Sequence, residues 1–281
     1  MIRNTLFLGF VINILASCTA LPAVQSPASI LAESPAAPAT ASRPPGLVIE
    51  AYALKGAPET DTRRFEPVEG TQEAILQRHD EARQEFFPDN WFYEDGQSGR
   101  YVYLDGERLT AVELTIPVTP VATVTMYDIL IQVKREDETL FEFPAGQASP
   151  QTPIQGLWVY GGHWALEVAR VSITNSDVDN EVSSDTTGYV VVDGSILNEL
   201  YGYEEAFGFQ LMHGRPFYFF KRNGRIDAFY DGAEIPLAYE YILHYGCCSA
   251  ASLNPYRYQN MVSFFAQREG IWYYVEIGVY E

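Results

Sequence analysis

The sequence predicts an all-β protein that is made mainly of antiparallel hairpins and carries one helix near residues 71–87. Three observations support this class. Aromatic residues make up 14% of the chain, and they gather with β-branched residues after residue 46. Apolar and polar residues alternate in short runs, which is the period of a strand. Dipeptides that contain glycine separate these runs and supply the positive φ angles of tight hairpin turns.

The first predicted elements are a strand and the helix. Residues 47–54 (LVIEAYAL) alternate between apolar and polar side chains and predict a strand. In the helix over 71–87, Thr71 is the expected N-cap, Glu73 lies in the first turn and Pro88 follows the end. Its apolar stripe consists of Ile75, His79, Ala82 and Phe86. On this stripe, His79 is interpreted as a half-buried packing residue.

The remainder of the domain predicts a series of hairpins. Their turns are expected at Asp95-Gly96 and Ser98-Gly99 in 91–106, Gly161-Gly162 in 156–168, Asn223-Gly224 in 216–232, Glu269-Gly270 in 263–279 and Glu136-Asp137-Glu138 in 124–143. Pro117 and Pro120 mark the end of the strand that precedes the last of these segments, because proline cannot donate to a sheet ladder.

Three strands close with the same Asp-Gly pair, at Asp105-Gly106, Asp193-Gly194 and Asp231-Gly232. Strand–turn–strand units at a spacing of about 40–45 residues are typical of propeller blades. Residues 188–232 resemble the WD-repeat-like β-propeller units of exported bacterial proteins, in which a strand W/Y-x-V-V-D-G leads to x-F-x-x-x-x-G. The resemblance implies irregular, propeller-like β repeats, and the alternative is a β-sandwich or barrel.

The N-terminus has the layout of an export signal. Arg3 precedes an apolar run over 5–15 that is too short for a stable membrane span, and small residues then lead to Cys18. The tetrapeptide Leu15-Ala16-Ser17-Cys18 resembles the lipobox of bacterial lipoproteins. The resemblance implies that 1–17 is a signal peptide and that Cys18 is lipidated and begins the mature chain. An ordinary cleaved signal peptide with an incidental cysteine is the alternative.

The lipobox resemblance also implies a location. Thr19 stands where the family's inner-membrane retention signal has aspartate, so we expect an exported protein on the outer membrane or on the outer face of the cell membrane. Residues 18–46 are rich in proline, alanine and serine, and predict a disordered tether. Residues 47–281 form the predicted β-rich domain.

The net charge of −19 restricts the partners. Such a polyanion is not expected to bind nucleic acid. The expected partners are the membrane, through the anchor, and a protein or carbohydrate. We predict no cofactor, and calcium is suggested only by the oxygen-rich loop 175–181, which lacks the glycine and distal glutamate of an EF-hand.

Cys247 and Cys248 are adjacent, and three interpretations stay open. Two buried thiols are the simplest. A vicinal disulfide requires a distorted peptide, because neighbouring Cα atoms are about 3.8 Å apart. A metal site with His244 is the third, although it lacks a fourth ligand at recognisable spacing.

No familiar catalytic motif is present, and the catalytic residues are unknown. Acid/base candidates are Glu167 and Glu276 inside apolar strands, with Asp193, Asp227 and Asp231 nearby in the pattern. Strand alternation predicts solvent-facing positions for the two glutamates. The binding candidates are aromatic side chains that could form an exposed stacking platform, with the best loop at 198–209; they are Trp158, Trp164, Tyr201, Tyr203 and Phe207.

These observations favour a cell-surface or envelope lipoprotein that is a ligand- or protein-binding module rather than an enzyme. The alternatives are a carbohydrate-active hydrolase with paired carboxylates and a structural lipoprotein of envelope assembly.

Overall fold

The computed structural model describes residues 44–59, 63–83, 90–94, 97–117, 127–148, 152–175, 182–245 and 254–280. They belong to one compact unit, Ala37–Glu281. The predicted signal peptide, Cys18, Pro120, both adjacent cysteines and most of the calcium-like loop lie outside the described residues. Within the described part of the chain, no helix is long and apolar enough to cross a membrane.

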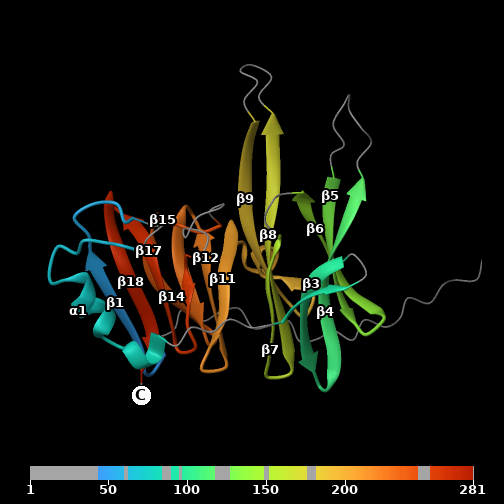
Figure 1. Ribbon diagram of the computed structural model, residues 1–281, viewed down its shortest axis with the longest axis horizontal. Helices are drawn as coiled ribbons and strands as arrows, with labels where there is room; N and C mark the ends of the chain where they lie inside the picture. Colours follow the sequence, from blue (N-terminus) through green and yellow to red (C-terminus); the bar gives the residue numbers. More distant parts are fainter. Residues whose placement is uncertain are drawn as a thin grey trace, which may run out of the picture. The chain divides into compact units, whose positions relative to one another are not determined.

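The predicted all-β class is confirmed, and the strands form three sheets (Figure 1). The first contains β1 (Leu47–Ala53), β18 (Ile271–Val279), β17 (Met261–Arg268) and β15 (Tyr241–Ile242) in that order, with β16 (Tyr256–Arg257) also paired to β17. The second is a meander of β11 (Glu205–Met212), β12 (Arg215–Arg222), β13 (Arg225–Tyr230) and β14 (Ala233–Tyr239).

The third sheet is the largest. Its order is β10 (Ser195–Ile196), β9 (Val182–Val192), β8 (His163–Asn175), β6 (Glu138–Gln147), β5 (Tyr127–Arg135), β4 (Glu107–Pro117), β3 (Gln97–Leu104) and β2 (Trp91–Glu94), with β7 (Ile154–Tyr160) paired to β8. Among the strand pairs of the described residues, only β6 and β8 are parallel. None of the three sheets closes into a barrel among the described strands.

The turns explain why the chain reverses where it does. Asn223 and Gly224 between β12 and β13 have φ angles of 53° and 70°, and Glu269 and Gly270 between β17 and β18 have 53° and 75°. Two consecutive positive φ angles are the mark of a type I′ turn, whose twist matches that of the flanking strands. The Asp-Gly pairs at 105, 193 and 231 have the same two positive angles.

Three apolar clusters join the sheets face to face. One face of the four-stranded sheet, with Phe207 and Phe219, packs on Phe264 of the first sheet. Its other face, with Phe209 and Phe220, packs on β7–β9. The third cluster joins β3–β6 to β7–β9, so the nine-stranded sheet folds over its own core. The four-stranded sheet is therefore covered on both faces. This explains why the sequences of its strands β11 and β12 are almost continuously apolar.

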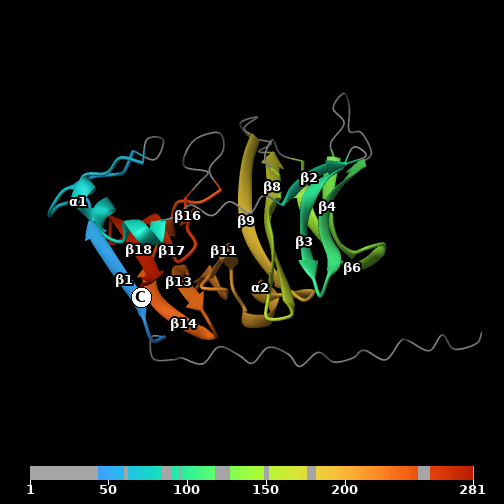
Figure 2. The same ribbon diagram turned by 60° about the horizontal axis from the view of Figure 1, so that its bottom comes forward.

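The helical segment is shorter than the sequence predicts. α1 (Gln72–Gln77) ends where the C-cap Arg78 becomes extended, His79 takes a φ of 61°, and a 3₁₀ turn, η1 (Asp80–Arg83), follows. The predicted N-cap is confirmed, since Thr71 Oγ1 accepts from the N–H of Ala74. The continuous stripe is wrong from His79 on: Ile75 packs on the first sheet, whereas His79 has a positive φ angle and its ring stacks on Tyr280. Figure 2 shows α1 beside that sheet. Phe86 and Pro88 lie outside the described residues.

A second helix was not predicted from the sequence. α2 (Leu197–Tyr201) lies at the start of the expected loop 198–209 and ends at Gly202, which has a φ of 68°. Residues 205–209 of that segment belong to the strand β11.

Candidate functional site

Two glutamates that were expected on solvent-facing sides of strands are buried. Glu167 of β8 and Glu276 of β18 both have no exposed surface. The expectation was wrong because each strand is covered on both faces, by a neighbouring sheet in one case and by the α1 segment in the other. A buried carboxylate requires hydrogen-bond donors or a cation. The partners of each glutamate therefore define a site around it.

Glu167 joins all three sheets. It accepts hydrogen bonds from the backbone N–H groups of Gly208 and Phe209 in β11, at 2.9 and 2.8 Å. The hydroxyl of Tyr245 donates to it at 2.6 Å, and the guanidinium of Arg257 in β16 pairs with it at 2.7 Å. Burial and the Glu167 carboxylate raise the pKa of Tyr245 well above its ordinary value. All four donors are committed to Glu167, so this centre holds the structure together.

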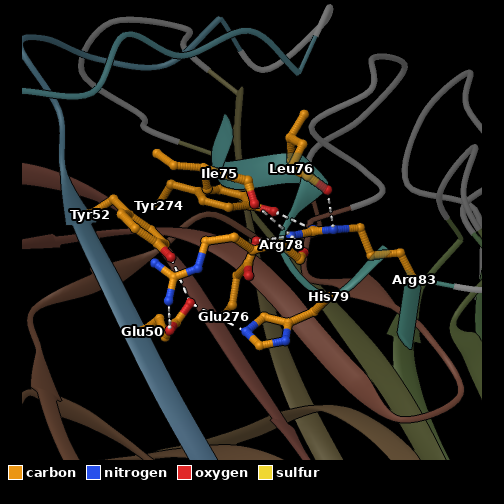
Figure 3. A network of polar contacts seen from close by, with 9 residues as sticks. All are labelled: Glu50, Tyr52, Ile75, Leu76, Arg78, His79, Arg83, Tyr274 and Glu276. Atoms are coloured by element: carbon orange, nitrogen blue, oxygen red, sulfur yellow. Dashed lines mark hydrogen bonds and ion pairs between the residues drawn. The ribbon is translucent and has the colours of Figure 1, made fainter. Parts of the chain in front are cut away.

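Glu276 belongs to a polar cluster on the outer face of the first sheet (Figure 3). In the register of β1 with β18, it stands directly opposite Glu50. Two carboxylates in such a cross-strand pair repel each other unless cations lie between them. Two arginines of the helical segment supply those cations: Arg78 contacts Glu50 Oε1 at 2.7 Å, and Arg83 contacts Glu276 Oε1.

Arg83 is the inner of the two arginines. Its guanidinium also donates to the carbonyls of Ile75, Leu76 and Arg78 and lies 3.0 Å from the hydroxyl of Tyr274. These carbonyls lie at the end of α1, where that of Ile75 also accepts from the N–H of Arg78, so Arg83 both caps the helix and orients Glu276. Although burial alone would lower the pKa of Arg83, Tyr274 and Glu276 raise it above its ordinary value.

Glu50, His79 and Glu276 meet at the centre of this cluster. One ligating atom from each lies within 4.8 Å of the other two. His79 Nε2 is 3.5 Å from Glu50 Oε2, which is ion-pair distance for a protonated ring but not a hydrogen bond. The ring of His79 stacks on Tyr280, with the centroids 3.6 Å apart. His79 is therefore held in place and turned towards the two carboxylates (Figure 3).

Two buried atoms of the cluster lack a hydrogen-bond partner: His79 Nε2 and Glu276 Oε2. Leaving a buried polar atom unpaired costs about 1–3 kcal/mol. The second oxygen of Glu50 is better satisfied, because the hydroxyl of Tyr52 donates to it at 2.6 Å. Burial first, and then Glu50, raise the pKa of Tyr52 above its ordinary value, so this hydroxyl keeps its proton.

The aromatic residues that the sequence suggested for binding lie mostly inside the protein. Trp158, Tyr203 and Phe207 are buried in the clusters around the four-stranded sheet, and Trp164 is buried in the core of the largest sheet. Tyr201 is half-buried against Tyr203. The exposed platform predicted from these five residues is not formed, because aromatic rings on doubly covered strands fill the space between sheets.

Exposed aromatic residues are found instead at the outer edge of the largest sheet. Tyr93 of β2 and Tyr103 of β3 are 73% and 62% exposed, and Trp91 is also exposed. The guanidinium of Arg108 lies 5.0 Å from the ring centre of Tyr101 beside them. The two aromatic runs in 91–106 could have indicated this exposed aromatic group from the sequence. Their side chains are uncovered because β2 is an edge strand.

A pocket of about 460 Å³ lies between the sheets close to this edge. Leu157, Val159 and Leu211 give it an apolar wall, and Trp158, from the predicted binding set, also borders it. Polar groups stand at its rim. They belong to His213, Gln259 and Asn260, whereas Asn90, which also lines the pocket, is buried and hydrogen-bonded to Leu157 and Arg100. Ligand pockets usually combine an apolar wall of this kind with a few polar groups, at volumes of about 300–1,000 Å³.

The remaining acid/base candidates have local partners. Asp193 contacts His163 Nδ1 at 2.5 Å and accepts from the N–H of Trp164, and Asp231 pairs with Arg215. Asp227 accepts from two backbone N–H groups, of Leu237 and Ala238. His244 Nε2 lies 3.0 Å from Glu205. None of these contacts joins Glu167 to Glu276.

Comparisons of the chain with protein-family models, with curated proteins and with solved structures found no match. The chain is thus an all-β protein of three mainly antiparallel sheets. It contains a buried centre around Glu167, a cluster of two carboxylates and a histidine under the α1 segment, and a largely apolar pocket.

Proposed function

We propose that this chain is an exported, lipid-anchored protein whose folded domain binds a ligand or a partner outside the cytoplasm. The single observation that carries the binding function is the pocket bordered by Leu157, Trp158 and Leu211. Its wall is apolar and its rim offers amide and imidazole groups, so it suits a small molecule or a side chain with an apolar body and a hydrogen-bonding end.

The anchor rests on the tetrapeptide that ends at Cys18. A diacylglyceryl group contributes two chains, and each buried methylene adds about 0.8 kcal/mol, so the attachment would be stable. The segment 19–46 would act as a tether, and the propeller-like resemblance of 188–232 would make the domain a scaffold that presents its loops. The acidic surface supports a protein or carbohydrate partner and not a nucleic acid.

A hydrolase has less support. Acid/base hydrolysis of a glycosidic bond requires two carboxylates that face one cleft about 5–9.5 Å apart. Glu167 and Glu276 have different partners on different sheets, and the pocket does not contain either of them. A purely structural envelope lipoprotein would need no such pocket, which places it second to a binding protein.

The test combines one anchor measurement with one pocket variant. Intact mass spectrometry of protein from its native host should give a chain that begins at lipidated Cys18. Gln259→Trp would fill the pocket from its exposed rim and should abolish thermal stabilisation by small molecules that stabilise the wild type. Gln97→Trp, at an exposed position outside the pocket, is the matched control.

Two results would overturn the proposal separately. A mass that retains residues 1–17, or an unlipidated start, removes the anchor. Ligands that stabilise Gln259→Trp as well as the wild type remove the pocket as the binding site.

A further inference from the structure

We propose that Glu50, His79 and Glu276 form a binding site for a transition-metal ion of the zinc type. This site is separate from the pocket and does not depend on the proposed binding function. Its three ligating atoms lie within 4.8 Å of one another, on the outer face of the first sheet. They come from β1, β18 and the link between α1 and η1, three segments far apart in the sequence (Figure 3).

The two carboxylates present one oxygen each towards His79. Their other oxygens are occupied, that of Glu50 by Arg78 and that of Glu276 by Arg83. A hydrogen bond of this kind to the outer oxygen orients a ligating carboxylate in known metal sites, and Arg83, which backbone carbonyls hold in place, has this role for Glu276. Glu276 Oε2 and His79 Nε2 have no partner, and Glu50 Oε2, which accepts one hydrogen bond from Tyr52, keeps a second lone pair for an ion.

An independent observation supports a ligand at this point. Glu276 has no exposed surface, and its Oε2 has no partner; His79 Nε2 is likewise buried and unpaired. Two unpaired buried atoms that face the same point are costly for the folded state. A cation at that point would satisfy both at once.

The type of donor selects the ion. One imidazole nitrogen and two carboxylate oxygens suit zinc, whereas calcium and magnesium prefer oxygen ligands alone. Zinc ligands lie about 2.0–2.2 Å from the ion, so the three atoms would draw together by roughly 1 Å on binding. Three protein ligands leave a fourth position for water or another molecule.

Arg78 competes with the ion. The two guanidinium groups already balance the two carboxylates, so a dication would add positive charge. Arg83 is held by backbone carbonyls, but the side chain of Arg78 is 55% exposed and can release Glu50 into solvent. Metal binding would therefore exchange Arg78 for the ion on Glu50.

The experiment is calorimetric titration of chelator-treated full-length protein with Zn²⁺, with Mg²⁺ and Ca²⁺ as comparators. Wild type should bind one Zn²⁺ per chain and show no comparable binding of the other two. His79→Ala and Glu276→Gln should each lose this binding. His163→Ala removes an exposed histidine outside both the cluster and the pocket and is the matched control, with unchanged affinity.

Arg78→Ala gives a result that adventitious binding to histidine would not give. Removing the competing guanidinium should tighten Zn²⁺ binding by about two- to fivefold, the factor that corresponds to an exposed ion pair. No zinc binding by the wild type, or equal binding by His79→Ala, would overturn the site. Unchanged or reduced affinity in Arg78→Ala would overturn it as well. If Glu276→Gln does not fold, the His79 and Arg78 variants still decide the question.

Discussion

Glu167→Gln removes the charge of the buried glutamate at almost constant volume. Oε1 accepts from Gly208 and Tyr245, and Oε2 accepts from Phe209 and Arg257. A glutamine keeps one oxygen and turns an NH₂ group towards the other two donors. Two charge-assisted hydrogen bonds, each contributing about 1.5–3 kcal/mol, are therefore lost. The side chain of Arg257 is 30% exposed and regains some hydration, so the expected loss of unfolding free energy is about 3 kcal/mol, near the lower end of that sum.

The assay is urea unfolding followed by tryptophan fluorescence and far-ultraviolet circular dichroism, whose transitions must coincide. Glu142→Gln, on the exposed face of β6, is the control and should change the free energy by less than about 0.5 kcal/mol. Arg257→Gln and the double variant complete a cycle. The double variant should be more stable than the sum of the single effects predicts, by about 1–3 kcal/mol, because it leaves no unpaired charge.

A loss below about 1 kcal/mol for Glu167→Gln would refute the claim that this carboxylate is buried among four donors. Additive effects in the cycle would refute the direct pairing of Glu167 with Arg257, even if both single variants were destabilised.

Two further predictions concern close packing and alkaline stability. In Gly188→Ala the new Cβ would lie 2.5 Å from the carbonyl oxygen of Ala206 and 2.8 Å from the hydroxyl of Tyr245. We therefore expect the free energy of unfolding in urea to fall by about 1–3 kcal/mol. Gly56→Ala, whose Cβ meets open space, is the control and should not be destabilised; equal effects of the two variants would contradict the packing described. Burial, only partly offset by Arg268, raises the pKa of Tyr239 to about 12. Its ordinary value is about 10, so the stability from the neutral phenol is complete below about pH 10 and is lost as the pH rises through about 12. Tyr239→Phe should lose less stability than the wild type over this range, and parallel losses would show that the ring is not shielded from water.

The fold could be predicted from the sequence where local chemistry decides it. Asn223-Gly224 and Glu269-Gly270 require positive φ angles, and this alone places two hairpins. The end of α1 could not be predicted in this way. The stripe from Ile75 to Phe86 fits a longer helix, but Arg83 folds back onto the carbonyls at the end of α1. Glu276, which is distant in sequence, holds Arg83 there.

The candidate sites depended on tertiary packing even more. The sequence identifies Glu276 as a carboxylate inside an apolar strand. The alternation of apolar and polar residues could not show that both faces of β18 are covered. Its pairing with Glu50 follows from the register of β1 with β18, which no local pattern encodes. For the same reason, the sequence could not show that Phe207 and Trp158 are buried, because other sheets cover them.

The pairing of β1 with β18 also determines the order in which the molecule can be completed. Leu47 lies opposite Val279, and the seven residue pairs of this ladder join the first described strand to the last. Closing so long a loop is entropically unfavourable until the intervening sheets exist, and it cannot occur before the last strand has been synthesised. During synthesis, β1 is therefore an unpaired apolar edge that requires protection from aggregation. The Glu50–Glu276 pair, and the cluster that depends on it, can therefore form only once β18 has been synthesised and has paired with β1.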